Sequence, residues 1–483
     1  MGLALPAMIA GTLPVAAPAG VGLGYSRGPD RGSVPMTHPI AAYQQKKQRL
    51  TEQLRGVDAA GLRLGKDTSN LFRDRRAGAG PRLDVRGFNQ VLAVEPGAGF
   101  VEAEGMTTYA DLTAACLARG VMPAVVPQLK SITVGGAVSG VGIESSSFRY
   151  GLVHETVLEM EVLLADGRTV VARPDNEHRD LFYGLPNSYG TLGYVLRLKA
   201  KVLPVKPFVH LAHVRHQDMQ ALFDDIARRC EGPIDFLDGV VFGHGEYYLT
   251  VGRFVDEAPY TSDYTYERIY YRSIRERSED FLSTAHYLWR WDTDWFWCSK
   301  NLLAQNPIVR RLYGRKRLNS VTYTRIMRWN SRWQITRRLN RLLGLHSESV
   351  IQDVDIPLGR CAEFLAFYLD TIRFTPVWLC PLRAYDRSAV FTLYPMDPQA
   401  TYVNFGFWDV MRFRGELPPG YYNRKVEAKV RDLGGIKSLY SDVYFTPEEF
   451  WAAYNRPGYD ALKARYDPQG RLKDLYDKCV LKG

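Results

Sequence analysis

The sequence of 483 residues has little cysteine and no closely spaced cysteine pair. Its six cysteines lie far apart along the chain, at Cys116, Cys230, Cys298, Cys361, Cys380 and Cys479. Zinc ribbons and dense disulfide frameworks both require cysteines at short, recurring spacings. The sequence therefore excludes both classes, and a reducing cytoplasm is the compartment that fits best.

Long apolar runs and an N-terminal basic segment are also absent. The first 37 residues are rich in Ala, Gly and Pro, and Pro6, Pro14 and Pro18 would interrupt any membrane-spanning helix there. No basic stretch precedes them, as a secretory signal would require. A helical pattern follows Met36, so we interpret residues 1–37 as a disordered leader or the product of a misplaced start codon.

Acidic residues are missing from one window of the chain. Between Trp295 and Ser347 there is no Asp or Glu, whereas twelve basic residues occur there: Lys300, Arg310, Arg311, Arg315, Lys316, Arg317, Arg325, Arg328, Arg332, Arg337, Arg338 and Arg341. The whole chain has a formal charge of +10, so the remainder is slightly acidic. The basic character is local.

Tryptophan gathers at the same window. Six of the nine tryptophans are Trp289, Trp291, Trp295, Trp297, Trp329 and Trp333. Trp beside Lys or Arg is typical of a surface that rests on anionic lipid. A solvated basic helix face over buried aromatics explains the pattern equally well. Nucleic acid is not expected, because no zinc-finger or RNP-type motif accompanies the charge.

The stretch TVGGAVSGVGIESSSFRYG at residues 133–151 has an unusually bare backbone. It lacks the Gly-Lys-Ser/Thr of a phosphate loop and the third glycine of a dinucleotide fingerprint. We expect a loop whose backbone N–H groups approach a diphosphate in a nest-like arrangement. A glycine-rich surface loop without a ligand is the alternative.

The flanking sequence predicts an α+β unit over about residues 40–205. Two short strands separated by residues 96–99 precede a helix over residues 109–119 that ends at Gly120. Asp166–Gly167 predicts a hairpin, and a second glycine turn at 190–193 leads into a strand that ends at Pro204.

The order of LGKDTSN (64–70), the stretch at 133–151, LLADGRTV and SYGTLGYV is similar to the FAD-binding domain of the vanillyl alcohol oxidase and p-cresol methylhydroxylase superfamily. Within it, the chain resembles the Diminuto-type branch of sterol side-chain reductases. NPIVRRLYG at 306–314, VIQDVDIP at 350–357, VWLCPL at 377–382, YSDVYF at 440–445 and EEFW at 448–451 extend the resemblance to residue 483.

This resemblance implies a two-part FAD-binding domain followed by an α+β substrate (cap) domain. We expect the FAD-binding domain over 38–205, the substrate domain over 206–445 with the basic Trp-rich segment at 289–347, and a C-terminal helical segment over 446–483. The implied FAD contacts are Gly65, Lys66, Asp67, Thr68, Ser69, Asn70, Thr133, Val134, Gly135, Gly136, Ala137, Ser139, Gly140, Gly142, Ile143, Glu144, Ser145, Ser146, Gly190, Thr191, Gly193 and Val195.

Many members of the superfamily tether the flavin through a histidine in the first loop, and LGKDTSN has none. We therefore expect non-covalent FAD, with NADPH as electron donor docking transiently. His210, His213 and His216 recur at a spacing of three on a predicted strand, which splits the rings between two faces, so no metal site is expected.

The resemblance implies reduction of an isolated carbon–carbon double bond in a lipid. Bacterial relatives of the branch reduce a methylene branch on a fatty acyl chain to a methyl, after a methyltransferase has formed it. A sterol side chain is the alternative substrate, and an oxygen-using oxidase or a non-catalytic lipid-surface protein are alternatives from other classes. We expect a phospholipid-bound acyl substrate and a cytoplasmic protein on the inner face of the plasma membrane.

An isolated alkene accepts hydride poorly, so its reduction requires a proton donor in a dry site, aromatic faces to stabilise a cation, and an apolar tunnel. Alternation in a predicted strand LYSDVYF places Tyr440, Asp442 and Tyr444 on one side. Tyr440, polarised by Asp442, is our first candidate donor, and Glu144 is a further catalytic candidate. Asp353 and Asp355 share one side of VIQDVDIP, and a structural hydrogen-bonding role is the alternative for all of them.

Overall fold

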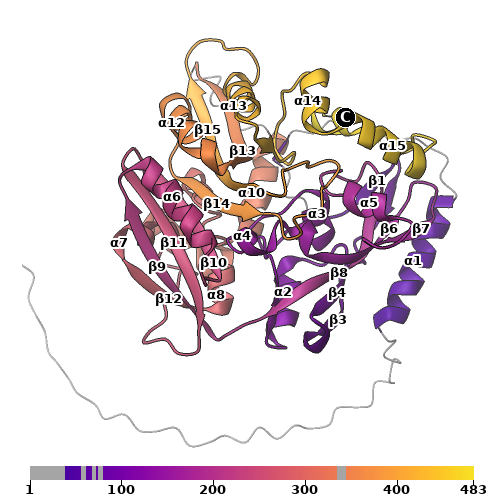
Figure 1. Ribbon diagram of the computed structural model, residues 1–483, viewed down its shortest axis with the longest axis horizontal. Helices are drawn as coiled ribbons and strands as arrows, with labels where there is room; N and C mark the ends of the chain where they lie inside the picture. The colour runs from indigo at the N-terminus through magenta and orange to yellow at the C-terminus, as the bar shows by residue number, and fades with distance from the viewer. Residues whose placement is uncertain (1–38, 56–60, 68–71, 74–79, 334–343, 483) are drawn as a thin grey trace, which may run out of the picture. The chain divides into compact units, whose positions relative to one another are not determined.

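The computed structural model describes residues 39–482 apart from 56–60, 68–71, 74–79 and 334–343 (Figure 1). Residues 39–483 form one compact unit, and residues 1–37, for which we predicted a leader, lie outside the described residues. Helices and strands are both abundant, so the α+β class is confirmed. None of the described helices combines the length and apolar character that crossing a bilayer requires.

The N-terminal part combines one long helix with two small parallel strands. Helix α1 (Pro39–Arg55) packs against β2 (Arg82–Asp84), and β2 pairs in parallel with β1 (Arg63–Gly65). The buried side of α1 includes Tyr43, whose hydroxyl donates to the Glu161 carboxylate at 2.9 Å. This contact attaches α1 to the next sheet.

The second sheet has six strands. Its central order is β3 (Val91–Glu95), β4 (Phe100–Glu104), β8 (Tyr194–Pro204), β6 (Val157–Leu163) and β7 (Thr169–Ala172), and β5 (Val121–Pro123) also pairs with β8. The hairpin at Asp166–Gly167, the break after β3 and the end of β8 at Pro204 were all predicted correctly. The predicted helix at 109–119 is α2 (Tyr109–Leu117), begun by the Thr108 side chain, which accepts from the amide of Asp111.

The third sheet has eight antiparallel strands in the order β12-β9-β11-β10-β14-β15-β13-β16. Their bounds are β9 (Phe208–His216), β10 (Phe236–Gly243), β11 (Glu246–Val255), β12 (Glu279–Ser283), β13 (His346–Pro357), β14 (Val377–Arg383), β15 (Thr401–Phe413) and β16 (Ile436–Lys437). Helices α6 (Met219–Cys230), α12 (Cys361–Thr371) and α13 (Tyr421–Asp432) cover one face of this sheet (Figure 1).

The two faces of the eight-stranded sheet differ in chemistry, because successive side chains point to opposite sides of a strand. The face under the helices is aliphatic and Phe-rich, and includes Val354, Leu379 and Phe405. The opposite face, called the inner face below, carries Asp238, Asp353, Asp355, Trp378, Cys380, Asn404 and Trp408. It meets the glycine-rich stretch through contacts between β14 and α4 (Ser147–Tyr150).

The C-terminal helices return to the first half of the chain. They are α14 (Pro447–Ala453), α15 (Arg456–Tyr466) and α16 (Leu475–Cys479). Helix α15 packs on α5 (Arg179–Gly184) so closely that a Cβ on Gly184 would overlap the Leu462 side chain. Sequence analysis predicted helices here, but not this return.

The remaining helices connect the sheets. They are α3 (Val134–Ser139), α7 (Tyr270–Glu276), α8 (Thr284–Leu288), α9 (Pro307–Tyr313), α10 (Ser320–Trp333), and the short 3₁₀ helices η1 (Pro96–Ala98), η2 (Val153–Thr156), η3 (Cys298–Leu302), η4 (Arg315–Arg317) and η5 (Leu358–Arg360).

Candidate flavin site and adjoining acid

The glycine-rich stretch begins with a helix rather than the open loop we expected. Helix α3 starts after Thr133, whose backbone is extended. Its first two amides are used within the protein: Val134 N donates to the Thr107 carbonyl at 3.0 Å and Gly135 N to the Gly105 carbonyl at 2.9 Å. A Cβ on Gly135 would lie 2.8 Å from that Gly105 oxygen, so glycine is needed for contact between two backbones.

Gly142 serves internal packing too. A Cβ there would lie 2.9 Å from Val153 Cγ2 and 3.0 Å from Pro127 Cγ. We expected glycine here because it would leave backbone amides open to a diphosphate. Instead, the direction in which a Cβ would point is filled by protein atoms. Gly142 lets the chain turn tightly beneath α3, and Gly142 N donates to the Ala137 carbonyl at 3.0 Å.

The serines after Glu144 hold this stretch in place. Ser146 Oγ donates to the Ala124 carbonyl at 2.8 Å, and Ser147 Oγ accepts from the Glu144 amide at 3.1 Å. Ser145 Oγ lies 2.8 Å from the Tyr287 hydroxyl of α8. The three serines thus join the stretch to two other segments.

The other two predicted flavin segments lie beside elements that sequence analysis did not connect to them. The Asp67 carbonyl of the first loop accepts from Arg328 of α10 at 3.1 Å, whereas Thr68, Ser69 and Asn70 lie outside the described residues. In the turn before β8, Tyr189 N donates to the Ser139 carbonyl at 3.1 Å and its hydroxyl to the Gly140 carbonyl at 3.3 Å. The turn at 190–193 is therefore anchored to the end of α3.

The remaining predicted contacts lie in known elements: Gly65 ends β1, Gly136 and Ala137 lie in α3, and Val195 lies in β8. Ile143 is half-buried. In the turn before β8, Gly190 has φ +76° and Gly193 has φ +155°, and the Thr191 hydroxyl donates to the Ser188 carbonyl. Lys66 follows β1 directly.

Glu144 lies in a buried cluster of charges. The Arg290 guanidinium is fully buried and pairs with Glu144 at 3.1 Å and with Asp238 of β10 at 2.8 Å. Trp378 Nε1 donates to the same Asp238 carboxylate at 3.2 Å. Burial raises the pKa of Glu144 and the Arg290 charge opposes that rise. We assign Glu144 to positioning, because Arg290 holds one of its two carboxylate oxygens.

Tyr440 has a different partner from the one we predicted. Residues 438–446 do not form a strand; β16 ends at Lys437, and the chain then turns. Asp442 pairs with Lys482 at 3.0 Å. The Tyr440 hydroxyl instead accepts from Trp408 Nε1 at 2.7 Å, and the carboxyl with which it interacts electrostatically is that of Asp353. Asp442 as the group that polarises Tyr440 was therefore wrong.

Asp353 is suited to hold a proton near neutral pH. Burial raises the pKa of Asp353 to about 7, an effect that the Tyr440 hydroxyl opposes and the nearby Asp355 reinforces. Burial, followed by the Asp353 charge, raises the pKa of Tyr440 well above its ordinary value. Both side chains keep some accessible surface. The pair is therefore a carboxylic acid joined to a neutral phenol.

Aromatic rings surround this pair. Phe72, just after the first loop, lies edge-on to Tyr440 with centroids 5.7 Å apart, and its amide donates to the Tyr440 carbonyl at 2.9 Å. The ring centroids of Phe72 and Trp295 are 5.5 Å apart, and those of Phe296 and Trp408 are 4.4 Å apart. The first loop, the Trp-rich segment and the inner face therefore meet at Tyr440.

Several buried polar atoms on the inner face and in or near the glycine-rich stretch lack a partner within the described structure. They include both amide atoms of Gln128, Glu144 Oε2, Arg290 Nε and Asp353 Oδ1. Such atoms are costly unless a ligand or water satisfies them. The edge of a flavin ring offers both donors and acceptors, so these residues fit FAD, with residues 65–67, α3 and the turn at 190–193 to hold it.

The Trp-rich segment is mostly interior. Trp291, Trp295 and Trp297 are buried, so the interpretation of these tryptophans as part of a surface that rests on anionic lipid is wrong. Trp329 is exposed, and the Trp333 side chain and Arg337, Arg338 and Arg341 lie outside the described residues. The alternative of buried aromatics holds for this part of the window.

The three histidines of β9 have separate partners. His210 lies 3.3 Å from Glu279, His213 is 3.0 Å from the Thr250 hydroxyl, and His216 is 3.1 Å from Asp225. Among the described residues no cluster of three His, Cys, Asp or Glu is placed to hold a metal ion.

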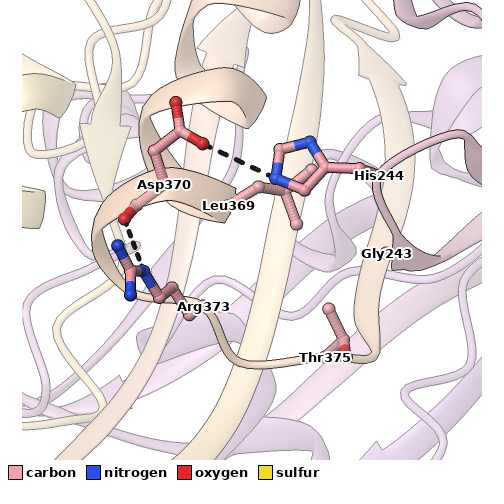
Figure 2. Close-up of a pocket in the computed structure, with 6 residues that line it drawn as sticks. All are labelled: Gly243, His244, Leu369, Asp370, Arg373 and Thr375. Atoms are coloured by element: carbon pink, nitrogen blue, oxygen red, sulfur yellow. Dashed lines mark hydrogen bonds and ion pairs between the residues drawn. The ribbon is translucent and has the colours of Figure 1, made fainter.

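A surface cavity of about 440 Å³ lies elsewhere, between the end of β10 and the end of α12. Figure 2 shows His244 pointing across it towards Asp370, 3.5 Å away, with Arg373 beside them. Both side chains of this pair are largely exposed. The cavity shares no residue with the flavin segments.

Sequence analysis missed Arg290, Asp238 and Trp408. Asp238 is a lone acid within the apolar run FLDGVVF, a pattern that marks a buried charge needing a partner. Arg290 and Trp408 carry no comparable local signal, because only the packing of distant segments brings them to Glu144 and Tyr440.

Comparison with known proteins defines the class. Residues 62–173 match the model of the FAD binding domain family. Delta(24)-sterol reductase of Homo sapiens is 28% identical over 405 residues, covering 80% of this chain and 75% of its own. The Delta(24)-sterol reductase homolog dhcr-24 of Caenorhabditis elegans is 25% identical over 417 residues, covering 79% and 76%.

Cytokinin dehydrogenase 7 of Oryza sativa subsp. japonica is 30% identical over 149 residues, covering 30% of this chain and 28% of its own. Together with the site, these likenesses define an FAD-dependent oxidoreductase. The chain is a Diminuto-like member of the vanillyl alcohol oxidase and p-cresol methylhydroxylase flavoprotein superfamily.

Proposed function

We propose that this flavoprotein reduces an isolated carbon–carbon double bond in a lipid, with NADPH as electron donor. The preferred substrate is a methylene branch on a phospholipid-bound fatty acyl chain, and a sterol side chain is the alternative. The observation that carries the proposal is the Tyr440 hydroxyl on the inner face, which accepts from Trp408, interacts electrostatically with the buried Asp353 carboxyl and is enclosed by aromatic rings. The sterol reductases named above support the alkene as the reacting group.

Protonation of the alkene is the step that this chain's own residues perform. Tyr440 donates its proton to the less substituted carbon, which leaves a tertiary cation, and Asp353 returns a proton to the phenolate. Trp408 Nε1, 2.7 Å from the Tyr440 oxygen, stabilises the developing negative charge. A carboxylic acid with a pKa of about 7 is half-protonated near neutral pH, where general acids are most effective.

The cation is stabilised by π faces rather than by a counter-ion. Phe72, Trp295, Phe296 and Trp408 supply ring faces near Tyr440, and each face is worth about 0.5–2 kcal/mol to a desolvated cation. Trp295 and Trp408 are buried, which keeps out water that would otherwise trap the cation. When bound and reduced, FAD supplies the hydride that completes the saturated product.

The buried Arg290 cluster positions the glycine-rich stretch against the substrate sheet. Removal of Arg290 would leave two buried carboxylates unpaired, at a cost of about 3–5 kcal/mol. Glu144 thus links the flavin stretch to β10 through Arg290 and Asp238. We infer that this link sets the distance between the flavin segments and the acid.

The direct test is anaerobic turnover of purified holoprotein in D₂O with NADPH and a phospholipid that carries a methylene-branched acyl chain. Mass spectrometry should show a methyl branch with one deuterium on the new methyl carbon, since Tyr440 exchanges its proton with solvent. A sterol with a side-chain double bond is the comparison substrate.

Reduction of the sterol but not the acyl chain would replace the preferred substrate with the alternative. Consumption of oxygen with an alcohol substrate, and no alkene reduction, would show an oxidase and contradict the proposal. In cells, loss of the gene should cause methylene-branched chains to accumulate, as expected if a methyltransferase acts in the preceding step.

A further inference from the structure

We propose that the surface formed by Leu303, Ile308, Leu312, Lys316 and Arg317, called the α9 surface, docks on an anionic phospholipid bilayer. Among the described residues the four most exposed large apolar side chains are Leu312 (76%), Ile308 (73%), Leu303 (67%) and Trp329 (57%). Three of them lie within ten residues of each other. Contiguous exposed apolar side chains mark a site of association with protein or membrane.

The geometry of α9 presents these side chains together. Ile308 and Leu312 are four residues apart and share one face of the helix. Leu303 closes the turn before α9, where Asn306 N donates to its carbonyl at 3.0 Å. The other face of α9 is fixed to the protein, because Arg310 is buried in an ion pair with Asp294. The apolar face is therefore held outward.

Only part of the basic window is free to meet lipid. Arg310, Arg315 and Lys300 are paired with Asp294, Asp263 and Asp409, which lie outside the window. Lys316, Arg317 and Arg325 are exposed and form no salt bridge with any residue the structure describes. The free positive charge thus lies directly after the apolar face of α9, on η4, and on α10.

This combination selects a bilayer as the occupant. Isoleucine and leucine side chains enter the acyl boundary, while each nearby Lys or Arg gains about 1 kcal/mol from anionic headgroups. A nucleic acid would use the charges and leave the apolar face in water. The uncompensated positive charge complements the negative surface of anionic lipid.

A row of rings leads from α9 to the proposed acid. Tyr313 of α9 lies 6.3 Å from Tyr323, Tyr323 lies 6.2 Å from Trp295, Trp295 lies 5.5 Å from Phe72, and Phe72 lies 5.7 Å from Tyr440. A bilayer held at α9 would present its acyl chains at one end of this row. The inference deepens the proposed function and rests on it, because a row of rings delivers substrate only if the protein acts on a lipid.

The experiment is co-flotation of the full-length holoprotein with vesicles of phosphatidylcholine, with or without about one third phosphatidylglycerol. We expect Lys316→Gln/Arg317→Gln to weaken binding to anionic vesicles about thirtyfold, and raised salt to mimic it. Ile308→Gln/Leu312→Gln should weaken binding by about tenfold or more. Binding requires no turnover, so its outcome is independent of the substrate assignment.

Matched controls replace exposed residues elsewhere. Val390→Gln/Leu481→Gln removes apolar side chains of 53% and 50% exposure, and Arg412→Gln/Arg414→Gln removes two exposed charges. Both should bind as the unsubstituted protein does, and all variants should retain FAD. The proposal would be overturned if the control variants lost binding equally or if the unsubstituted protein did not bind. It would also be overturned if both α9 variants bound as well as the unsubstituted protein, and the surface would then be assigned to a protein partner.

Discussion

At the scale of single residues, the neighbours of each buried carboxyl decide which of two aspartates can act as the acid beside Tyr440. Asp353 and Asp355 lie on the same side of β13, yet their neighbours differ. Asp355 is fully engaged, since Asn404 donates to it at 2.7 Å and Tyr394 at 2.6 Å. Asp353 retains an unpartnered oxygen beside Tyr440. Asp353 is thus the acid that is free to exchange a proton.

Replacement of Asp353 by Asn or of Tyr440 by Phe should lower kcat by about 10²–10⁴-fold while FAD content stays unchanged. Asp442→Asn is the matched control, because that carboxylate pairs with Lys482 and does not reach Tyr440. Steady-state rates of alkene reduction provide the measurement. An Asp442 variant as impaired as the Asp353 variant would restore the partnership that we rejected.

The Asp353 carboxyl makes both activity and stability depend on pH. Its pKa rises from 3.8 to about 7 on folding, so the folded protein retains a proton that the unfolded chain releases above about pH 4. This stabilises the fold at low pH, and the contribution is lost as the pH rises through 7. Buried Glu155, with a pKa raised to about 7, acts in the same direction.

We therefore expect the activity to fall above pH 7 and the thermal midpoint to decrease between about pH 5 and 8, with a smaller decrease in Asp353→Asn. Calorimetry of the holoprotein across this pH range measures the thermal midpoint. An identical pH dependence in the variant would show that Asp353 is ionised throughout.

At the scale of elements, α3 and the turn beneath it show how a bare backbone can be required by packing. Val153 begins η2, and its amide donates to the Gly142 carbonyl at 2.9 Å. The Val153 side chain occupies the space into which a Cβ on Gly142 would point. The glycine thus allows η2 to approach the segment that follows α3.

Gly142→Ala should destabilise the fold by about 1–3 kcal/mol through overpacking, and Val153→Ala in the same chain should restore part of that loss. Gly97→Ala is the matched control, because no atom lies within 4 Å of the added Cβ. Urea unfolding and FAD content are the measurements.

Rescue by Val153→Ala distinguishes the two explanations of Gly142. If the glycine were required by a diphosphate, removing the two γ-methyl groups of Val153 would not return FAD to the single variant. Loss of FAD in both the single and the double variant, with normal stability, would favour the diphosphate.

At the scale of the whole molecule, three distant parts of the chain close around the flavin segments. The eight-stranded sheet supplies the inner face, the Trp-rich segment supplies rings, and the C-terminal helices reach back to the turn at 190–193. Lys463 of α15 donates to the Thr191 carbonyl at 2.9 Å, and Lys478 of α16 to the Tyr189 carbonyl at 2.6 Å. These contacts fix the position of the turn at 190–193, one of the segments that we expect to hold FAD.

We expect trichloroacetic acid to release all the FAD of the holoprotein into the supernatant. A tether requires a nucleophilic side chain at the flavin, and the first loop, LGKDTSN, contains neither histidine nor cysteine. Absorbance of supernatant and pellet measures the distribution. Flavin in the pellet would reveal a covalent link at another residue, which peptide mapping would locate.

The sequence by itself determined the features that depend on neighbours along the chain. Hairpins such as β6–β7, the helix α2 and the membership of the flavin superfamily all follow from local periodicity, turn residues and motif order. The glycine-rich stretch lies within the part of the chain that matches the FAD binding domain family, a match that rests on residues next to each other in the sequence.

Only the tertiary structure decided which residues meet across long separations. Tyr440 pairs with Asp353 rather than Asp442, Glu144 pairs with Arg290, and Trp295 and Trp297 lie inside rather than at the surface. Local alternation predicts the side of a strand on which a residue lies, but not what packs against that side. These pairings are fixed by the burial of two sheets against one stretch of backbone, which no short segment encodes.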